Sequence, residues 1–155
     1  KCRCRDARDW MNNIPKPTYA YVPGVNARHP EDWFDPLKHD VMPGMTEVDM
    51  QKSHAWRAGM LYRQEGFFWE CHEVLEPLWL VAPPGTLRSF LQANIQMANA
   101  LLKLKMGRPN AAMRLCKIVD EHLDACAPRM VILGQSVQAL RKEAIALAQI
   151  LRESQ

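Results

Sequence analysis

The sequence predicts an all-α protein: a compact antiparallel bundle of about five helices, preceded by an extended proline-rich N-terminal arm. After residue 45, apolar residues recur at the three- and four-residue spacing of amphipathic helices. No run alternates apolar and polar residues with the two-residue period of a strand. The chain has 155 residues, the length of one ordinary domain with a single core.

Residues 1–45 are expected to form the arm, and residues 46–155 the helical bundle domain. Six of the eleven prolines fall within the first 43 residues, which excludes long helices there. Four aromatic residues are interleaved with these prolines: Tyr19, Tyr21, Trp33 and Phe34. Because so aromatic a segment is unusual for a free linker, we expect the arm to lie on the helical body, anchored by these rings.

The first two helices are predicted from their end signals. Thr46 and Asp49 resemble a capping box that opens a helix over 46–65, and Gly66 is a plausible stop. A second helix is expected over 67–80, because the Ala82-Pro83-Pro84-Gly85 turn ends it.

Three further helices complete the prediction. The third spans 86–106 and is closed by Gly107 in the position that favours a left-handed cap. Pro109 suits the first turn of a fourth helix, which we expect to reach residue 126. The fifth begins at Ser136 and carries an apolar stripe to Leu151.

Composition excludes several classes of protein. Lysine and arginine exceed aspartate and glutamate by 20 to 17, and most of this surplus lies in the first eight residues, so no nucleic-acid partner is expected. No apolar run approaches the ~20 residues that span a bilayer, so no membrane partner is expected either. The five cysteines lack a C-x-x-C pair, which favours a reducing cytoplasm over a disulfide framework or zinc ribbon. The Cys2-x-Cys4 pair is a minor candidate for metal contact.

The second helix carries the one concentrated polar site. Measured from Phe68 on the apolar face, Trp79 lies at about 20°, His72 at about 40° and Glu76 at about 80°. An imidazole and a carboxylate at i and i+4 can share one divalent cation. Glu73 is a candidate general base if a neighbouring helix approaches it. The segment departs from the H-E-x-x-H pattern of zinc proteases, because Glu76 replaces the second histidine.

A metal site needs at least one further ligand. His29 in the arm, Gln92 and Gln96 are the candidates, although the two glutamines also fit a solvated stripe of the third helix. Asn94 falls within the apolar face of that helix, where its amide must find a partner, either His72 or a loop carbonyl. The simplest alternative is that His72 and Glu76 form an ordinary boundary ion pair.

Two segments, 66–79 and 88–96, together resemble the bacterial and archaeal family called domain of unknown function 309. That family has a His, three residues, a Glu, two residues and then Trp or Tyr, which correspond here to His72, Glu76 and Trp79. The resemblance covers roughly residues 46–125, and it implies a compact helical fold and a metal-binding role for the His and the Glu, without an established substrate. The sequence departs from the family at the turn 107–110 and at Ala93.

Two hypotheses follow. In the first, His72 and Glu76 hold a divalent ion, Zn, Mn, Fe or Ni, in a metal-dependent hydrolase, and Glu73 or a bound water handles the proton. In the second, His72, Glu76 and Trp79 form a structural corner of a non-enzymatic binding or assembly module. Exposed helix faces would then pair with another chain, a homo-oligomer included, through tryptophan anchors. These anchors are Trp56, Trp69 and Trp79.

Overall fold

The computed structural model describes residues 13–154, which contain seven helices and one two-stranded hairpin. The chain is therefore mostly helical, as predicted. The basic tail and the Cys2-x-Cys4 pair lie outside the described residues. The elements are α1 Asp35–Lys38, α2 Glu47–Lys52, α3 His54–Glu65, α4 Phe68–Val81, α5 Thr86–Lys105, α6 Pro109–Asp124, β1 Val131–Ile132, β2 Gln135–Ser136 and α7 Val137–Glu153.

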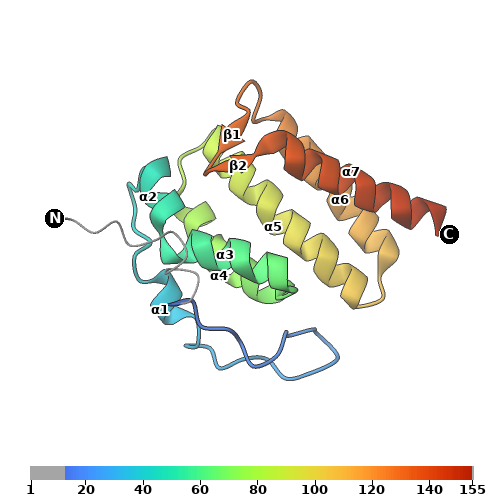
Figure 1. Cartoon of the computed structure of the whole chain (residues 1–155), viewed down its shortest axis with the longest axis horizontal. Coiled ribbons are helices and arrows are strands. Elements are labelled where there is room, and N and C mark those ends of the chain that lie inside the picture. The colour runs from blue at the N-terminus through green and yellow to red at the C-terminus, as the bar shows by residue number, and fades with distance from the viewer. Residues whose placement is uncertain (1–12, 155) are drawn as a thin grey trace.

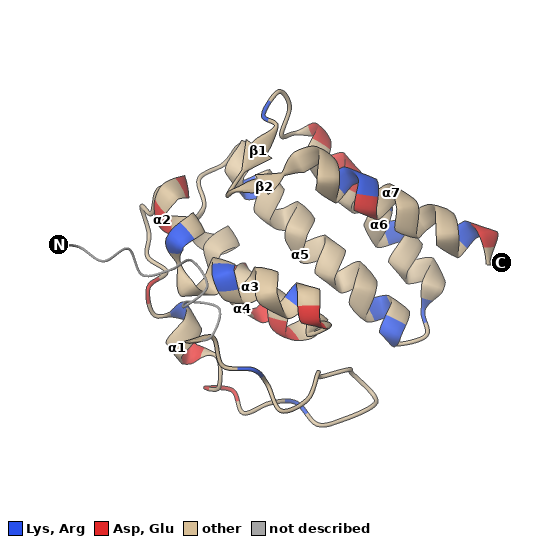
Figure 2. Cartoon of the chain, in the orientation of Figure 1, with Lys and Arg blue, Asp and Glu red and all other residues tan. Residues whose placement is uncertain are grey.

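Helix α5 is the centre of the bundle. It packs against α4 on one side and α6 on the other, while α3 covers α4 and α7 covers α6 (Figure 1). The charges of α5 lie only near its two ends (Figure 2), at Arg88, Lys103 and Lys105. The uncharged stretch between them is buried on several sides, which is what a central helix requires.

The predicted first helix is two helices, because Ser53 interrupts it. The capping box at Thr46 and Asp49 is confirmed. At Ser53, however, the backbone is extended (φ −65°, ψ 151°). The buried Ser53 hydroxyl donates to the carbonyl of Met50 and accepts from the N–H of Trp56, so one side chain ends α2 and caps α3. Serine side chains compete with helical hydrogen bonds in this way.

The other predicted helix ends are close to those observed. Gly66 and Gly107 both adopt positive φ, at 88° and 72°, and end α3 and α5 as expected. Pro109 occupies the first turn of α6. The Ser136 hydroxyl caps α7 by accepting from the N–H of Ala139.

The hairpin was not predicted, so the expectation of no sheet is wrong at this point. Val131 pairs with Ser136 and Ile132 pairs with Gln135, in antiparallel register. The turn residues Leu133 and Gly134 both have positive φ, 54° and 72°, as in the two-residue turns that suit hairpins. Strands of two residues are too short to show an alternating pattern.

The arm follows the surface of α3 and α4 and buries Phe34 and Leu37 in the core. Its one helical turn, α1, was not predicted; Pro36 lies in that first turn, where a missing N–H costs nothing. Polar contacts also fasten the arm, since the Tyr62 hydroxyl of α3 donates to the carbonyl of Pro15 over 2.6 Å. In residues 13–154, no helix is long and apolar enough to cross a membrane.

Candidate functional site

His72 and Glu76 lie one turn apart on α4 and point to the same side. The Nε2 atom of His72 is 3.3 Å from a carboxylate oxygen of Glu76. The side chains are 32% and 48% exposed, so both groups are reached by solvent. This part of the sequence prediction, an imidazole and a carboxylate sharing one edge of the helix, matches the structure.

The other nitrogen of His72 is held by α5. Its Nδ1 atom lies 3.0 Å from Oδ1 of Asn99, whose amide group donates to Oε1 of Gln96 over 3.2 Å. Because an amide oxygen only accepts hydrogen bonds, Nδ1 carries the proton and donates. In the neutral ring the lone pair is then on Nε2, the nitrogen beside Glu76.

The structure does not bring the predicted third ligand to this pair. His29 lies against Glu70, which is two residues before His72 and therefore about 200° around α4. The physical reason is the aromatic packing of the arm, which draws His29 towards Phe34 and Trp69. Within residues 13–154, no cluster of three or more histidine, cysteine, aspartate or glutamate side chains is arranged to hold a metal ion.

Glu73, the predicted general base, also lies apart from the His72–Glu76 pair. Glu73 forms an ion pair with Lys38 of α1, at 3.5 Å, and lines a cavity beside His29. Since α1 approaches α4 on that side, Glu73 is turned towards the arm and away from the His72 edge.

Two of the remaining predicted residues, Trp79 and Phe68, have a cation over their rings. The Arg88 guanidinium stacks on the ring of Trp79, 4.5 Å from its centroid, and the Lys105 amine lies 5.0 Å from the centroid of Phe68. Gln92 is part-buried on α5, one turn before Gln96.

Asn94 is fully buried, but its partner is neither of those expected. Its amide donates to the carbonyl of Phe90 in the same helix over 3.0 Å, and its oxygen has no hydrogen-bond partner in the described part of the chain.

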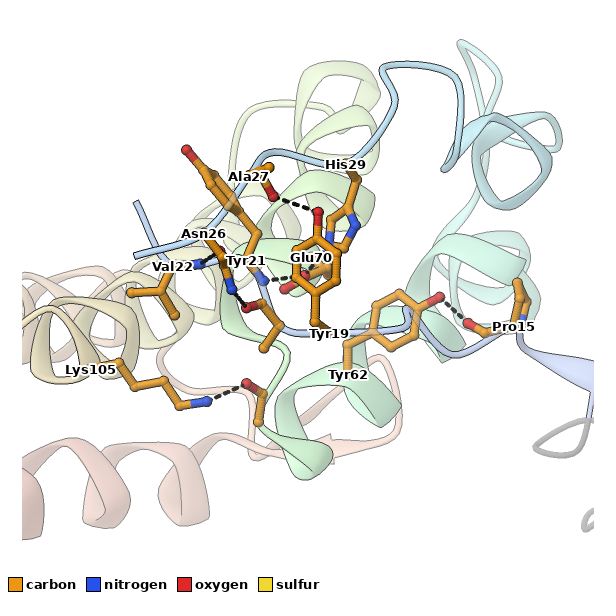
Figure 3. Close-up of polar contacts among 12 residues, drawn as sticks. Pro15, Tyr19, Tyr21, Val22, Asn26, Ala27, His29, Tyr62, Glu70 and Lys105 are labelled. Carbon is orange, nitrogen blue, oxygen red and sulfur yellow. Dashed lines mark hydrogen bonds and ion pairs between the residues drawn. The ribbon is translucent and has the colours of Figure 1, made fainter. Parts of the chain in front are cut away.

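Sequence reasoning missed Glu70, which is completely buried on the first turn of α4. One carboxylate oxygen, Oε2, lies 2.6 Å from His29 Nε2 and accepts the backbone N–H of Tyr21 over 2.8 Å (Figure 3). Glu70 falls one turn before Val74 and two turns before Leu78, both buried. That spacing was the available signal that this glutamate faces inwards.

The negative charge of Glu70 contributes to raised pKa values of two neighbouring groups, Tyr62 and Cys71. Burial, and to a lesser extent this carboxylate, raise the pKa of the Tyr62 hydroxyl well above its ordinary value. Burial is also the main cause that raises the pKa of the Cys71 thiol to about 12, with Glu70 adding to it and Arg63 opposing it. Cys71 is therefore a neutral thiol at physiological pH.

Comparison with protein families finds a match within the helical part of the chain. Residues 56–115 match the family described as Domain of unknown function (DUF309), as the sequence resemblance indicated. The matched segment contains His72, Glu76, Trp79 and Asn99, and it excludes His29. Searches of curated proteins and of solved structures find no match to the chain.

Proposed function

We propose that His72 and Glu76, which lie within the segment 56–115 that matches the DUF309 family, bind a divalent metal ion, Zn, Mn, Fe or Ni, in a site with open coordination positions. The orientation of His72 is the observation that carries this proposal. Asn99 accepts the proton of Nδ1, and Nε2 is left beside the Glu76 carboxylate. Metal-ligating histidines typically have such a partner on the nitrogen that does not bind the metal.

The separation of the two groups also suits a shared ion. A nitrogen and an oxygen that each lie roughly 2.0–2.1 Å from a tetrahedral ion are about 3.3 Å apart, and His72 Nε2 and Glu76 Oε2 are separated by 3.3 Å. An imidazole with one carboxylate favours transition metals over calcium or magnesium. Two protein ligands bind weakly, so water, a bound molecule or a second chain must complete the site.

The activity we propose for this site is hydrolysis. A divalent ion held there would supply Lewis-acid activation of water or of a substrate carbonyl or phosphoryl group. The chain's own contribution is to fix the imidazole through Asn99 and to keep the Glu76 carboxylate half-exposed, where it can also accept a proton. Glu73 is paired with Lys38, so it is a weaker candidate for the base than the sequence suggested.

A second candidate function is a binding or assembly module in which this corner is structural. It is favoured by the two ties between α4 and α5 at this edge, His72 to Asn99 and Trp79 to Arg88. Such a module would use the exposed helix faces for a partner, a second copy of the chain included.

Isothermal titration of the metal-free protein with Zn²⁺, Mn²⁺, Fe²⁺ and Ni²⁺ tests the proposal. We expect saturable binding of at least one ion, weakened at least tenfold in His72→Ala and in Glu76→Gln. His54→Ala is the matched control, because His54 also pairs with a carboxylate, Asp40, at 2.9 Å. Equal losses in the three variants, or no binding by the wild type, would favour the structural module.

Hydrolysis is tested separately, because an ion can bind without catalysis. Phosphate-ester and carboxyl-ester model substrates are assayed with the bound ion, and turnover is expected to disappear in His72→Ala. A metal-loaded protein that hydrolyses none of them would restrict the function to metal binding.

A further inference from the structure

A cavity between the arm and α4 lies apart from the His72–Glu76 edge. It has a volume of about 260 Å³. Its walls combine aromatic and charged side chains: Arg28, His29, Glu31, Phe34, Trp69 and Glu73. Small-molecule sites characteristically join apolar walls to a few oriented polar groups.

Glu70 fixes the orientation of His29 at this cavity. The Oε2 atom of Glu70 accepts the N–H of Tyr21, and the imidazole Nε2 is 2.6 Å from the same oxygen. An ionised carboxylate only accepts hydrogen bonds, so Nε2 carries the proton and donates it to Glu70. In the neutral ring the lone pair of Nδ1 is then an acceptor, and no residue in 13–154 makes a hydrogen bond to it.

The surrounding arm makes this orientation rigid. The ring of Tyr19 stacks on His29 at 4.7 Å between centroids, and its hydroxyl donates to the carbonyl of Ala27 over 2.6 Å (Figure 3). The side chain of Asn26 accepts the N–H of Val22 and donates to the carbonyl of Ala20, which closes the loop before His29. The imidazole is thus positioned before any ligand arrives.

The buried His29–Glu70 pair is also energetically unfavourable as a means of packing the arm against α4. The second oxygen of Glu70, Oε1, is buried and has no hydrogen-bond partner in the described residues. A buried acceptor without a partner costs about 1–3 kcal/mol, and more for a charged group. An apolar side chain of similar size would fasten the arm without that cost, so the pair points to a role for His29 besides holding the arm.

The charges at the cavity indicate the ligand. The Arg28 guanidinium lies over the Trp69 ring, 5.3 Å from its centroid, and makes no ion pair within residues 13–154. Glu73 is neutralised by Lys38. The exposed Arg28 and Glu31 therefore offer one cation and one anion at the cavity that His29 also lines.

We propose that this cavity binds a small carboxylate that also carries a hydroxyl or ammonium group. The ligand carboxylate pairs with Arg28, and its hydroxyl or ammonium group donates a hydrogen bond to Nδ1 of His29. Trp69 and Phe34 form the apolar wall beside these contacts, and Glu31 attracts the ligand when the donor is an ammonium group. This site is independent of the metal proposed at His72.

Nitrogen NMR of the histidine side chains tests the proposal, with the protein in EDTA so that metal binding plays no part. Glycolate and glycine are the probes, and acetate is the comparison because it lacks the donor group. We expect His29 to be protonated on Nε2, and at least one probe to shift its Nδ1 resonance saturably. Acetate should bind at least tenfold more weakly, since a hydrogen bond worth about 1.4 kcal/mol changes affinity tenfold.

The variant Arg28→Gln keeps an exposed side chain and should weaken the probe at least tenfold without altering the unbound His29 signal. Arg114→Gln, an exposed arginine of α6, is the matched control and should leave binding unchanged. No shift of His29 with either probe would overturn the proposal. A shift that acetate reproduces with equal affinity, or one that persists in Arg28→Gln, would overturn it as well.

Discussion

Asn99 of α5 holds the imidazole of His72 of α4 through a 3.0 Å hydrogen bond between Oδ1 and Nδ1. The contact joins the central helix of the bundle to the helix that carries the candidate metal ligands. It selects the nitrogen of His72 that faces Glu76. Any metal affinity of the pair should therefore depend on a residue that touches no metal.

The substitution Asn99→Ala should lower metal affinity about 10–100-fold, because the ring loses the partner that fixes its orientation. Asn99→Asp retains an acceptor oxygen and should stay within a few-fold of the wild type. Titration calorimetry measures both, with Gln138→Ala, at an exposed glutamine of α7, as control. An unchanged affinity in Asn99→Ala would separate the hydrogen bond from metal binding.

Gly59 of α3 should not tolerate a side chain. A Cβ atom there would meet Cδ2 of Leu75 at 2.5 Å, because α3 and α4 cross at this point. Gly59→Ala should destabilise the protein by about 1–3 kcal/mol through overpacking. Urea unfolding measures the change, and adding Leu75→Val should recover part of it. If helix propensity decided the outcome, Gly59→Ala would instead be more stable by roughly 1 kcal/mol.

Removal of one partner of the buried His29–Glu70 pair should destabilise the protein strongly. Glu70→Ala leaves His29 without its acceptor and is expected to cost about 3–5 kcal/mol of unfolding free energy. Glu73→Ala, on the same helix, removes only the part-exposed pair with Lys38 and should cost about 1 kcal/mol or less. Comparable losses in the two variants would show that the burial of Glu70 has little energetic weight.

Stability should decline in alkaline solution. The pKa of Cys71 rises on folding from 9.0 to about 12, and that of Tyr62 is raised from 10.0. Above pH 9 the folded chain therefore binds more protons than the unfolded chain, so the free energy of unfolding falls as pH rises. Below pH 9 the ionisation of Cys71 and Tyr62 should leave the free energy of unfolding unchanged. Between pH 9 and 12 the free energy of unfolding should decrease.

Urea unfolding between pH 8 and 11 measures this decline. In Cys71→Ala the slope against pH should be shallower, because one of the groups whose pKa rises on folding is gone. Equal slopes in the variant and the wild type would mean that the Cys71 thiol ionises as readily in the folded chain as in the unfolded one.

The helix ends could be predicted because their signals are local. The capping box at Thr46, the positive-φ glycines Gly66 and Gly107, and the cap at Ser136 each act within a few residues. The break at Ser53 has a local hydrogen-bond pattern too, but the periodicity of α2 and α3 continues across it. Burial of Ser53 decides that break, and burial depends on the whole fold.

The candidate site also has a part that local sequence predicts and a part that depends on the whole fold. The His72–Glu76 edge follows from i and i+4 spacing on one helix. The partner Asn99 depends on how α4 meets α5, and the pairing of His29 with Glu70 spans 41 residues. The aromatic residues of the arm carry no signal of which glutamate their histidine will meet, so His29 was predicted at the wrong carboxylate.

Elemental analysis of the purified protein, prepared without a metal-binding tag, tests the central claim most directly when made beside His72→Ala. We predict that, after dialysis against Zn, Mn, Fe or Ni, the wild type holds up to one such ion per chain, that His72→Ala loses it, and that His54→Ala retains it. Absence of metal from the wild type, even after dialysis against each ion in turn, would contradict the account and leave His72, Glu76 and Asn99 as a structural corner between α4 and α5.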